Sequence, residues 1–235
     1  MQILSEHFGP DVLAAFTRKE DGSFALPPEG PVFNDSQAQI LNGSGISAEG
    51  IFSIRQVHGS DVLCSGAAPG ALPAEQIPEG DAAIAADPRS VLTVRTADCL
   101  PIFLYDPLRK VRALVHAGWR STRGRIVQKT LAVMTADLGC RPQDIRAVLG
   151  PGIRSCCYQV GQELCADFPE QVIPRQGDWY LDLPAVNRDQ LAAAGIQKQN
   201  IADTADCTCC QQDYFSYRRE GPAAGRSLAI FAAKG

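Results

Sequence analysis

The sequence predicts an α+β fold in which mixed β-sheets form a layered sandwich covered by helices. Apolar, strand-like segments outnumber helical ones, and most of them lie between residues 51 and 155. The turn sequence DPLRK joins two of these segments and indicates an antiparallel hairpin. We expect a single domain over residues 1–235, with a loop-rich, irregular cap formed by residues 1–50.

Three helices are expected from apolar spacing and capping residues. The first follows Ser121 and Thr122, carries apolar residues at Val127, Leu131, Met134 and Leu138, and stops at Gly139. A second is predicted from near Cys157 to just before Pro169. The third begins after Asp182, a favourable N-cap residue, and closes at Gly195.

Composition excludes several partners. The net charge is −4 and the pI is about 5.4, whereas surfaces that bind nucleic acid normally carry a basic excess. The chain has no apolar run long enough to cross a membrane and does not start like a signal peptide, so we expect a cytoplasmic protein. The nine cysteines are then expected to be thiols, and the lack of coiled-coil heptads favours a monomer.

Two of the three histidines and one cysteine stand at the ends of predicted strands. His58 ends IFSIRQVH, His116 ends VRALVH, and Cys99 lies between VLTVRTAD and LPIFLYD. Two imidazoles and a thiolate that converge on one ion, with a fourth position left for water, would make a catalytic type of zinc site. The alternative interpretation is that each histidine is a hydrogen-bonded structural residue, because the spacing matches no standard zinc motif.

Six motifs then identify a resemblance to a known family. They are QVHG (56–59), RTADCLP (95–101), HAGWR (116–120), GPGIRSCCYQVG (150–161), YLDL with NRDQL (180–191) and FSYRR (215–219). The chain resembles YfiH-type proteins in the order of these motifs. This family was once called multicopper polyphenol oxidases or laccase-domain proteins, and its members are now described as zinc-dependent purine nucleoside enzymes. The resemblance implies that His58, Cys99 and His116 are the zinc ligands.

The resemblance also implies which substrates to expect, namely purine nucleosides and phosphate. Zinc lowers the pKa of a bound water to about 7, which suits deamination of adenosine at C6. Asp98 is the nearest carboxylate in the sequence and the candidate general acid or base, with a supporting role behind the ligands as the alternative.

Phosphorolysis requires an anion site in addition. We expect it at the backbone around Gly152, leading into the predicted helix near Cys157, together with Arg120, Arg154 and Arg18. Ordinary surface charge is the alternative explanation for these arginines. The family's usual N-terminal motif survives here only as Thr17 and Arg18, so substrate contacts from this region are expected to differ.

Other functions and sites stay open. Copper can substitute for zinc and give polyphenol oxidase (laccase) activity, but three histidines cannot build a full multicopper centre. Cys99 can instead act as a nucleophile with His116 as base, in an amide hydrolase that edits peptidoglycan precursors, and a non-catalytic zinc module is a third possibility. Cys207 and Cys210 lack a second pair in the sequence and are interpreted, with Cys156 and Cys157, as packed thiols rather than ligands.

Overall fold

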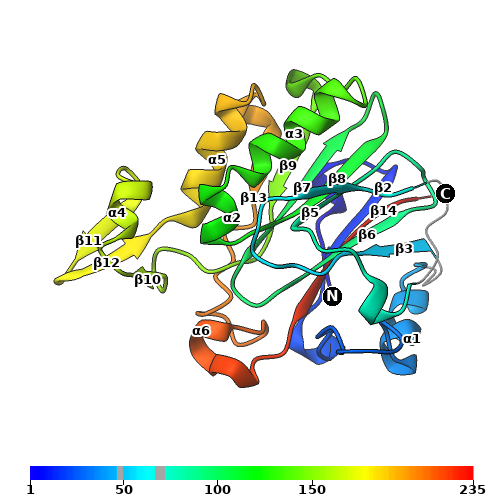
Figure 1. The fold of residues 1–235 in the computed structure, drawn as a ribbon, viewed down its shortest axis with the longest axis horizontal. Helices are drawn as coiled ribbons and strands as arrows, with labels where there is room; N and C mark the ends of the chain where they lie inside the picture. Colours follow the sequence, from blue (N-terminus) through cyan, green and yellow to red (C-terminus); the bar gives the residue numbers. More distant parts are fainter. Residues whose placement is uncertain (47–49, 67–71, 235) are drawn as a thin grey trace.

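Two large β-sheets pack face to face, and helices cover their outer sides (Figure 1). The computed structural model of the protein describes residues 1–46, 50–66 and 72–234. The first sheet has the strand order β1-β2-β14-β6-β3 and the second has the order β13-β9-β7-β8-β5-β4. Because β3/β6, β4/β5 and β13/β9 are parallel and the other pairs antiparallel, both sheets are mixed, as expected.

The strands have the following bounds. In the first sheet they are β1 (Gln2–Ile3), β2 (Val12–Phe16), β14 (Ser227–Ala233), β6 (Val91–Thr96) and β3 (Ile51–Ser53). In the second they are β13 (Ile201–Asp203), β9 (Arg146–Leu149), β7 (Leu100–Asp106), β8 (Val111–Ala117), β5 (Ala82–Ala85) and β4 (Val62–Cys64). A small third sheet of β10 (Gln159–Val160), β12 (Asp178–Leu181) and β11 (Val172–Arg175) projects from one side with helix α4 (Leu164–Asp167) (Figure 1).

Helices close the sandwich on both sides. Helix α1 (Asp35–Gly43) packs Leu41 against the outer face of the first sheet. On the outer face of the second sheet lie α3 (Ile126–Ala136) and α5 (Leu183–Ala193), with the short α2 (Trp119–Arg123) before α3. Helix α6 (Tyr217–Glu220) leads towards β14, and single 3-10 turns occupy Ser5–His7, Lys19–Asp21, Ala74–Gln76, Pro142–Asp144, Lys198–Asn200 and Gly221–Ala223.

The central strands are apolar on both faces because both faces are buried. In β7, Ile102 and Leu104 face the helices, whereas Phe103 and Tyr105 face the other sheet. This double burial removes the polar alternation that marks a solvent-exposed sheet.

The helix predictions are confirmed at two places and wrong at one. Asp182 caps α5 by accepting a hydrogen bond from the N–H of Ala185, and Val127, Leu131 and Met134 are buried on α3. The helix expected from Cys157 to Phe168 is wrong, because residues 155–157 form a turn, β10 follows, and only α4 is helical. The apolar spacing there reflects a shared core contact rather than one continuous helix face.

The expected irregular cap over residues 1–50 is also wrong, apart from positions 47–49, which lie outside the described residues. Strand β2 lies inside the first sheet between β1 and β14, and Val12, Ala14 and Phe16 are buried. Helix α1 is capped by Asn34 and Gln37, whose side chains each accept the other's backbone N–H. No helix in the described part of the chain is both long and apolar enough to span a bilayer.

We predict that Phe231→Ala destabilises the protein by about 3–5 kcal/mol, because the ring is fully buried between the sheets. Its centroid lies 5.1 Å from that of Phe8 and 5.4 Å from that of Phe103. Equilibrium urea unfolding measures the change. Leu108→Ala is the control, since Leu108 is 67% exposed and its loss should change stability by less than about 0.5 kcal/mol. Equal effects of the two substitutions would contradict the burial of Phe231 between the sheets.

Candidate metal centre and cavity

The structure brings His58, Cys99 and His116 together where the central strands β7 and β8 of the second sheet begin and end. Cys99 lies in the bend between β6 and β7, and His116 lies near the end of the neighbouring β8, opposite Pro101. His58 lies in the loop after β3 and adopts a positive φ of 57°. One ligand atom from each of the three residues falls within 4.8 Å of the others.

A buried carboxylate behind these residues fixes their orientation. Asp81 Oδ1 lies 2.8 Å from His116 Nδ1 and accepts a hydrogen bond of 3.0 Å from the N–H of His58. Asp81 Oδ2 accepts from the N–H of Gly59 at 2.7 Å and of Val57 at 3.3 Å. Because a carboxylate only accepts, Nδ1 of His116 is its donor, and Nε2 is left to face an ion.

The thiol of Cys99 and the imidazole of His116 stabilise each other's charged forms. Burial opposes ionisation of the Cys99 thiol, but His116 and His58 lower its pKa to about 6. Burial likewise opposes a charge on His116, but the Cys99 thiolate and Asp81 raise its pKa to about 9. A thiolate is the form of cysteine that binds metals and attacks electrophiles, so either chemistry is open to this arrangement.

Gly118 leaves room for the cluster. A Cβ at this position would lie 3.0 Å from Cys99 Sγ and 3.4 Å from His58 Cδ2. The glycine of the HAGWR motif therefore allows α2 to begin directly against Cys99 and His58.

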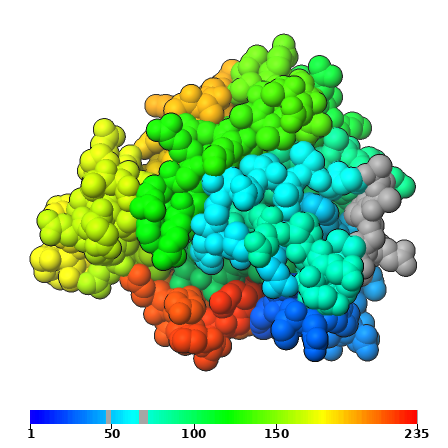
Figure 2. Space-filling view, viewed as in Figure 1, coloured from blue at the N-terminus to red at the C-terminus, as the bar shows by residue number. Residues whose placement is uncertain are grey.

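The three side chains open into a cavity of about 700 Å³. The segments that line it come from the regions near residues 55, 97, 119 and 218, which meet on one face of the molecule (Figure 2). Among the described residues, one carboxylate lines the cavity, that of Asp98. Five arginines line it as well, namely Arg55, Arg95, Arg120, Arg218 and Arg226. Trp119, Tyr158 and Tyr217 add aromatic surface. A ligand with an anionic part and a flat ring suits these walls.

Arg95 is the most unusual of these arginines. It is 6% exposed, and its Nε donates to the carbonyl oxygen of Phe24 at 2.8 Å. Its two terminal nitrogens, Nη1 and Nη2, are buried and have no hydrogen-bond partner in the described protein. Burial lowers its pKa to about 10, so the side chain still carries its charge at neutral pH. An unpaired buried guanidinium is costly, and an anionic ligand would satisfy it.

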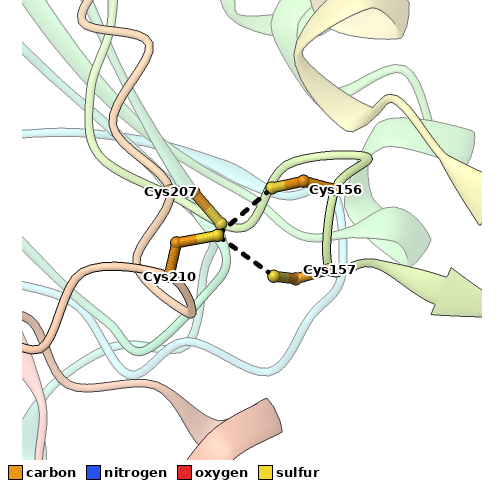
Figure 3. A group of neighbouring side chains, drawn as sticks. All are labelled: Cys156, Cys157, Cys207 and Cys210. Atoms are coloured by element: carbon orange, nitrogen blue, oxygen red, sulfur yellow. Dashed lines mark hydrogen bonds between the residues drawn. The ribbon is translucent and has the colours of Figure 1, made fainter.

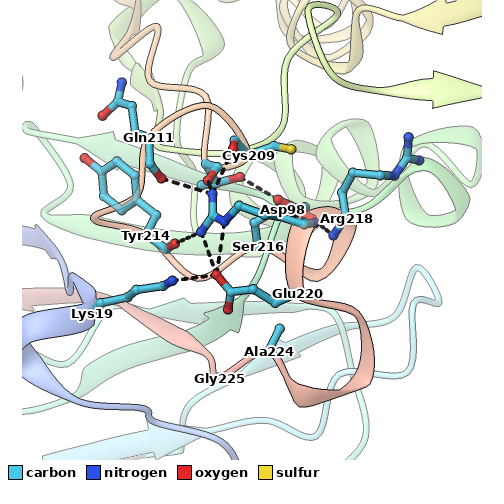
Figure 4. A network of polar contacts seen from close by, with 12 residues as sticks. Lys19, Asp98, Cys209, Gln211, Tyr214, Ser216, Arg218, Glu220, Ala224 and Gly225 are labelled. Carbon is cyan, nitrogen blue, oxygen red and sulfur yellow. Dashed lines mark hydrogen bonds and ion pairs between the residues drawn. The ribbon is translucent and has the colours of Figure 1, made fainter.

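Asp98 sits beside Cys99 in a network of hydrogen bonds (Figure 4). Its Oδ1 accepts from the hydroxyl of Thr208 at 2.7 Å, and its Oδ2 accepts from the backbone N–H of Arg218 at 2.6 Å. The neighbouring Arg219 binds the carbonyl oxygens of Thr208 and Cys209 and the carboxylate of Glu220. These contacts hold Asp98 in a backbone conformation with a φ of 92°, which is rare for a residue with a side chain.

The predicted anion-binding residues are only partly brought together. Arg120 lines the cavity, with its guanidinium 4.5 Å from the centre of the Trp119 ring. Arg18 lies outside the lining and pairs with Asp213 at 3.5 Å. Arg154 also lies outside it, because its guanidinium binds Asp203 and the carbonyl oxygens of Gly150 and Asp206.

The backbone around Gly152 does not offer free donors either. The N–H of Gly152 donates to the carbonyl oxygen of Asp206, and that of Ile153 donates to the carbonyl oxygen of Asp98. The chain turns here without the helix expected near Cys157, and these two N–H groups are satisfied internally, so neither is free to bind an anion.

Sequence reasoning missed Asp81 and Arg95. Asp81 directly precedes the buried strand AAIA, and an acidic residue at such a position is a signal for a buried, partnered carboxylate. Arg95 belongs to the motif RTADCLP and is the one charged residue in its buried strand. The sequence shows both as charged residues in or beside buried strands. It does not show their hydrogen-bond partners, which come from distant segments.

Comparisons with known proteins agree with the motifs. The family model described as multi-copper polyphenol oxidoreductase laccase matches residues 33–234. A protein of Deinococcus radiodurans named purine nucleoside phosphorylase is 36% identical over 231 residues, which cover 92% of this chain and 87% of the relative. A protein from an unknown prokaryotic organism named adenosine deaminase is 36% identical over 59% of this chain and 56% of its own length.

Solved structures share the fold. The chain resembles the hypothetical protein YfiH of Bacillus licheniformis with a TM-score of 0.85 and 26% identity, over 95% of this chain and 93% of that one. YlmD of Geobacillus stearothermophilus gives a TM-score of 0.84 and 26% identity over 96% and 93%. The α+β sandwich expected from the sequence is thus confirmed, and the chain belongs to the family described as multi-copper polyphenol oxidoreductase laccase.

Proposed function

We propose that this protein is a zinc-dependent enzyme of purine nucleosides that cleaves inosine, adenosine and guanosine with phosphate and deaminates adenosine. The observation that carries the proposal is the convergence of His58, Cys99 and His116 on an arginine-lined cavity. Relatives named purine nucleoside phosphorylase and adenosine deaminase support this substrate class.

The residues present fit a zinc ion. Two imidazoles and one thiolate are donors that zinc prefers, and three protein ligands are typical of catalytic rather than structural zinc sites. Asp81 supplies the hydrogen bond that metal-binding histidines usually make behind the ion. When bound, zinc supplies Lewis-acid polarisation of a substrate atom or of water. Copper would fit the same donors, but the chain's three histidines are too few for a multicopper oxidase centre.

In phosphorolysis, an oxygen of phosphate forms a bond to C1′ of the ribose while the glycosidic C–N bond breaks. The purine leaves with the bonding electron pair and gains a proton on a ring nitrogen. Arg95 and Arg120 are the residues we assign to phosphate, because Arg95 has two unpaired buried nitrogens and Arg120 is exposed on the cavity wall. Tyr158 and Trp119 are positioned to contact the flat base.

Deamination replaces the C6 amino group of adenosine with an oxygen from water and releases ammonia. It needs no phosphate, so the residues that we assign to phosphate are not required for it. Asp98 stays our candidate for proton transfer or for positioning Cys99. Its contacts with Thr208 and Arg218 favour positioning, since both carboxylate oxygens are already engaged. Substrate roles for Arg18, Gly152 and Arg154 stay predictions that their internal contacts do not favour.

One observation favours a second candidate, an amide hydrolase with Cys99 as nucleophile. The ionised Cys99, the protonated His116 and the orienting Asp81 have the order of a Cys-His-Asp triad. Such an enzyme has no chemical need for His58, whereas a zinc ion needs His58 as its third protein ligand. This difference makes His58 the residue that separates the two candidates.

We therefore predict that His58→Ala and Cys99→Ala each reduce phosphate-dependent release of hypoxanthine from inosine, and ammonia release from adenosine, by about 1,000-fold or more. Chromatographic product assays on the zinc-loaded enzyme measure both reactions. His7→Ala is the matched control, because His7 is the third histidine and lies outside the cavity lining. Full phosphorolysis and deamination in His58→Ala would contradict the role of His58 as a zinc ligand. Absence of both reactions in the zinc-loaded wild type would favour the thiol hydrolase.

Asp81→Asn is expected to weaken zinc binding by about 10–100-fold, since the neutral amide holds His116 less firmly than the carboxylate does. Competition with a chromophoric chelator measures the zinc affinity. Asp61→Asn removes the same charge from an exposed neighbour and should leave the affinity unchanged. If both variants bind zinc like the wild type, the orienting role of Asp81 is wrong.

For Arg95→Gln we predict a rise in the KM for phosphate of about 10–100-fold, because a hydrogen-bonded charge contributes about 1.5–3 kcal/mol. Arg95→Lys should recover part of the loss. Steady-state kinetics with varied phosphate test this, and adenosine deamination is the internal control since it uses no phosphate. An equal loss of both activities would mean that Arg95 only maintains the fold.

A further inference from the structure

A second group of metal-binding side chains lies outside the cavity lining. Cys156 and Cys157 follow β9 on one loop, and Cys207 and Cys210 follow β13 on another. Because β9 and β13 are parallel neighbours, the loops after them leave the same edge of the sheet. Figure 3 shows the two pairs of thiols facing each other. The fold thus places Cys156 and Cys157 beside Cys207 and Cys210 as a second pair of cysteines.

The distances suit a single ion better than disulfides or a larger cluster. All four sulfur atoms lie within 4.8 Å of one another. Cys210 Sγ lies 3.4 Å from Cys156 Sγ and 3.3 Å from Cys157 Sγ, far longer than the roughly 2.05 Å of a disulfide. A tetrahedral zinc ion with Zn–S bonds of about 2.3 Å holds its sulfurs about 3.8 Å apart. An iron–sulfur cluster places its own irons and sulfides between the cysteines and needs wider spacing.

The local backbone also has the form of a metal-binding turn. Cys207 and Cys210 have the C-x-x-C spacing common in structural zinc sites. Residues 208–210 form a turn, and the backbone N–H groups of Cys210 and Arg154 point to the sulfur of Cys207. N–H donors directed at a sulfur stabilise a thiolate.

Arginines surround the group and would balance its charge. Four thiolates around one Zn²⁺ carry a net charge of about −2 after the thiol protons have been released to solvent. The guanidinium of Arg175 binds the carbonyl oxygens of Ser155 and Cys156, and that of Arg218 binds the carbonyl oxygen of Cys157. Arg154 binds the carbonyl oxygen of Asp206, next to Cys207. Positive groups therefore contact both loops.

We propose that Cys156, Cys157, Cys207 and Cys210 bind one zinc ion as a closed tetrathiolate site that fastens these two loops together. Four protein ligands leave no position for substrate, so the ion is structural. The site supports the cavity through the next residues in the chain. Tyr158 follows Cys157 and lines the cavity, and Thr208 follows Cys207 and binds Asp98. This inference stands independently of the proposed function.

Metal analysis of the purified full-length protein, together with native mass spectrometry, tests the proposal. We expect about two zinc ions per wild-type chain, about one in Cys99→Ala and about one in Cys210→Ser. The matched control is Cys209→Ser, which lies on the same turn but outside the four-sulfur group and should keep both ions. A single ion that Cys99→Ala removes and Cys210→Ser retains would overturn the second site and leave the first intact.

A spectroscopic measurement keeps the test valid if Cys210→Ser fails to fold. Zinc-edge X-ray absorption on Cys99→Ala isolates the proposed ion with all four thiols intact. We expect four sulfur neighbours at about 2.3 Å and no imidazole nitrogen. Nitrogen or oxygen ligands at the remaining ion would overturn the proposal, and so would iron in place of zinc. Thiol titration of the unfolded, unreduced wild type that finds fewer than the nine cysteines would show a disulfide and overturn it as well.

Discussion

The buried carboxylate of Asp81 is the interaction on which the candidate site depends. It joins the loop of His58 to the strand of His116, which are far apart in the sequence, through one side chain. Burial alone would favour the neutral acid, but His116 and the backbone N–H groups of Gly59 and Val57 lower the pKa of Asp81 below its ordinary value. The hydrogen bonds of a buried, fully paired carboxylate are strong, and they fix the orientation of the groups that donate to it. The positions of both imidazoles relative to Cys99 follow from it.

The backbone around this group of side chains is also strained. His58 and Asp98 both have positive φ angles, which cost about 1–3 kcal/mol each for residues with side chains. The surrounding hydrogen bonds offset this cost: Asp81 holds the first loop, and Thr208 with Arg218 holds Asp98. Strain that persists in this way fixes side chains that an unstrained turn would direct elsewhere, and here it directs His58 and Cys99 towards one point.

The sequence could predict which residues stand at the ends of strand-like segments, but not which distant segments become neighbours in the fold. Strand ends predicted that His58, Cys99 and His116 would meet, and the structure brings them together, while their ligation of zinc stays a prediction. The N-terminal strand was missed because Val12–Phe16 is buried on both faces and shows no alternation. The partners of Asp81, and the pairing of the cysteine loops, arise only when distant strands become neighbours.

The two groups of thiols and imidazoles differ in a way that fits their surroundings. The group at His58, Cys99 and His116 has three donors and faces a cavity whose charged walls are almost entirely basic. The group of four cysteines has a complete donor set, and nearby guanidinium groups bind its backbone carbonyl oxygens. Thr208 and Asp98 connect the two groups by a single hydrogen bond. Fastening the cysteine loops would therefore restrict Asp98, and through it the bend that carries Cys99, without adding any group to the cavity itself.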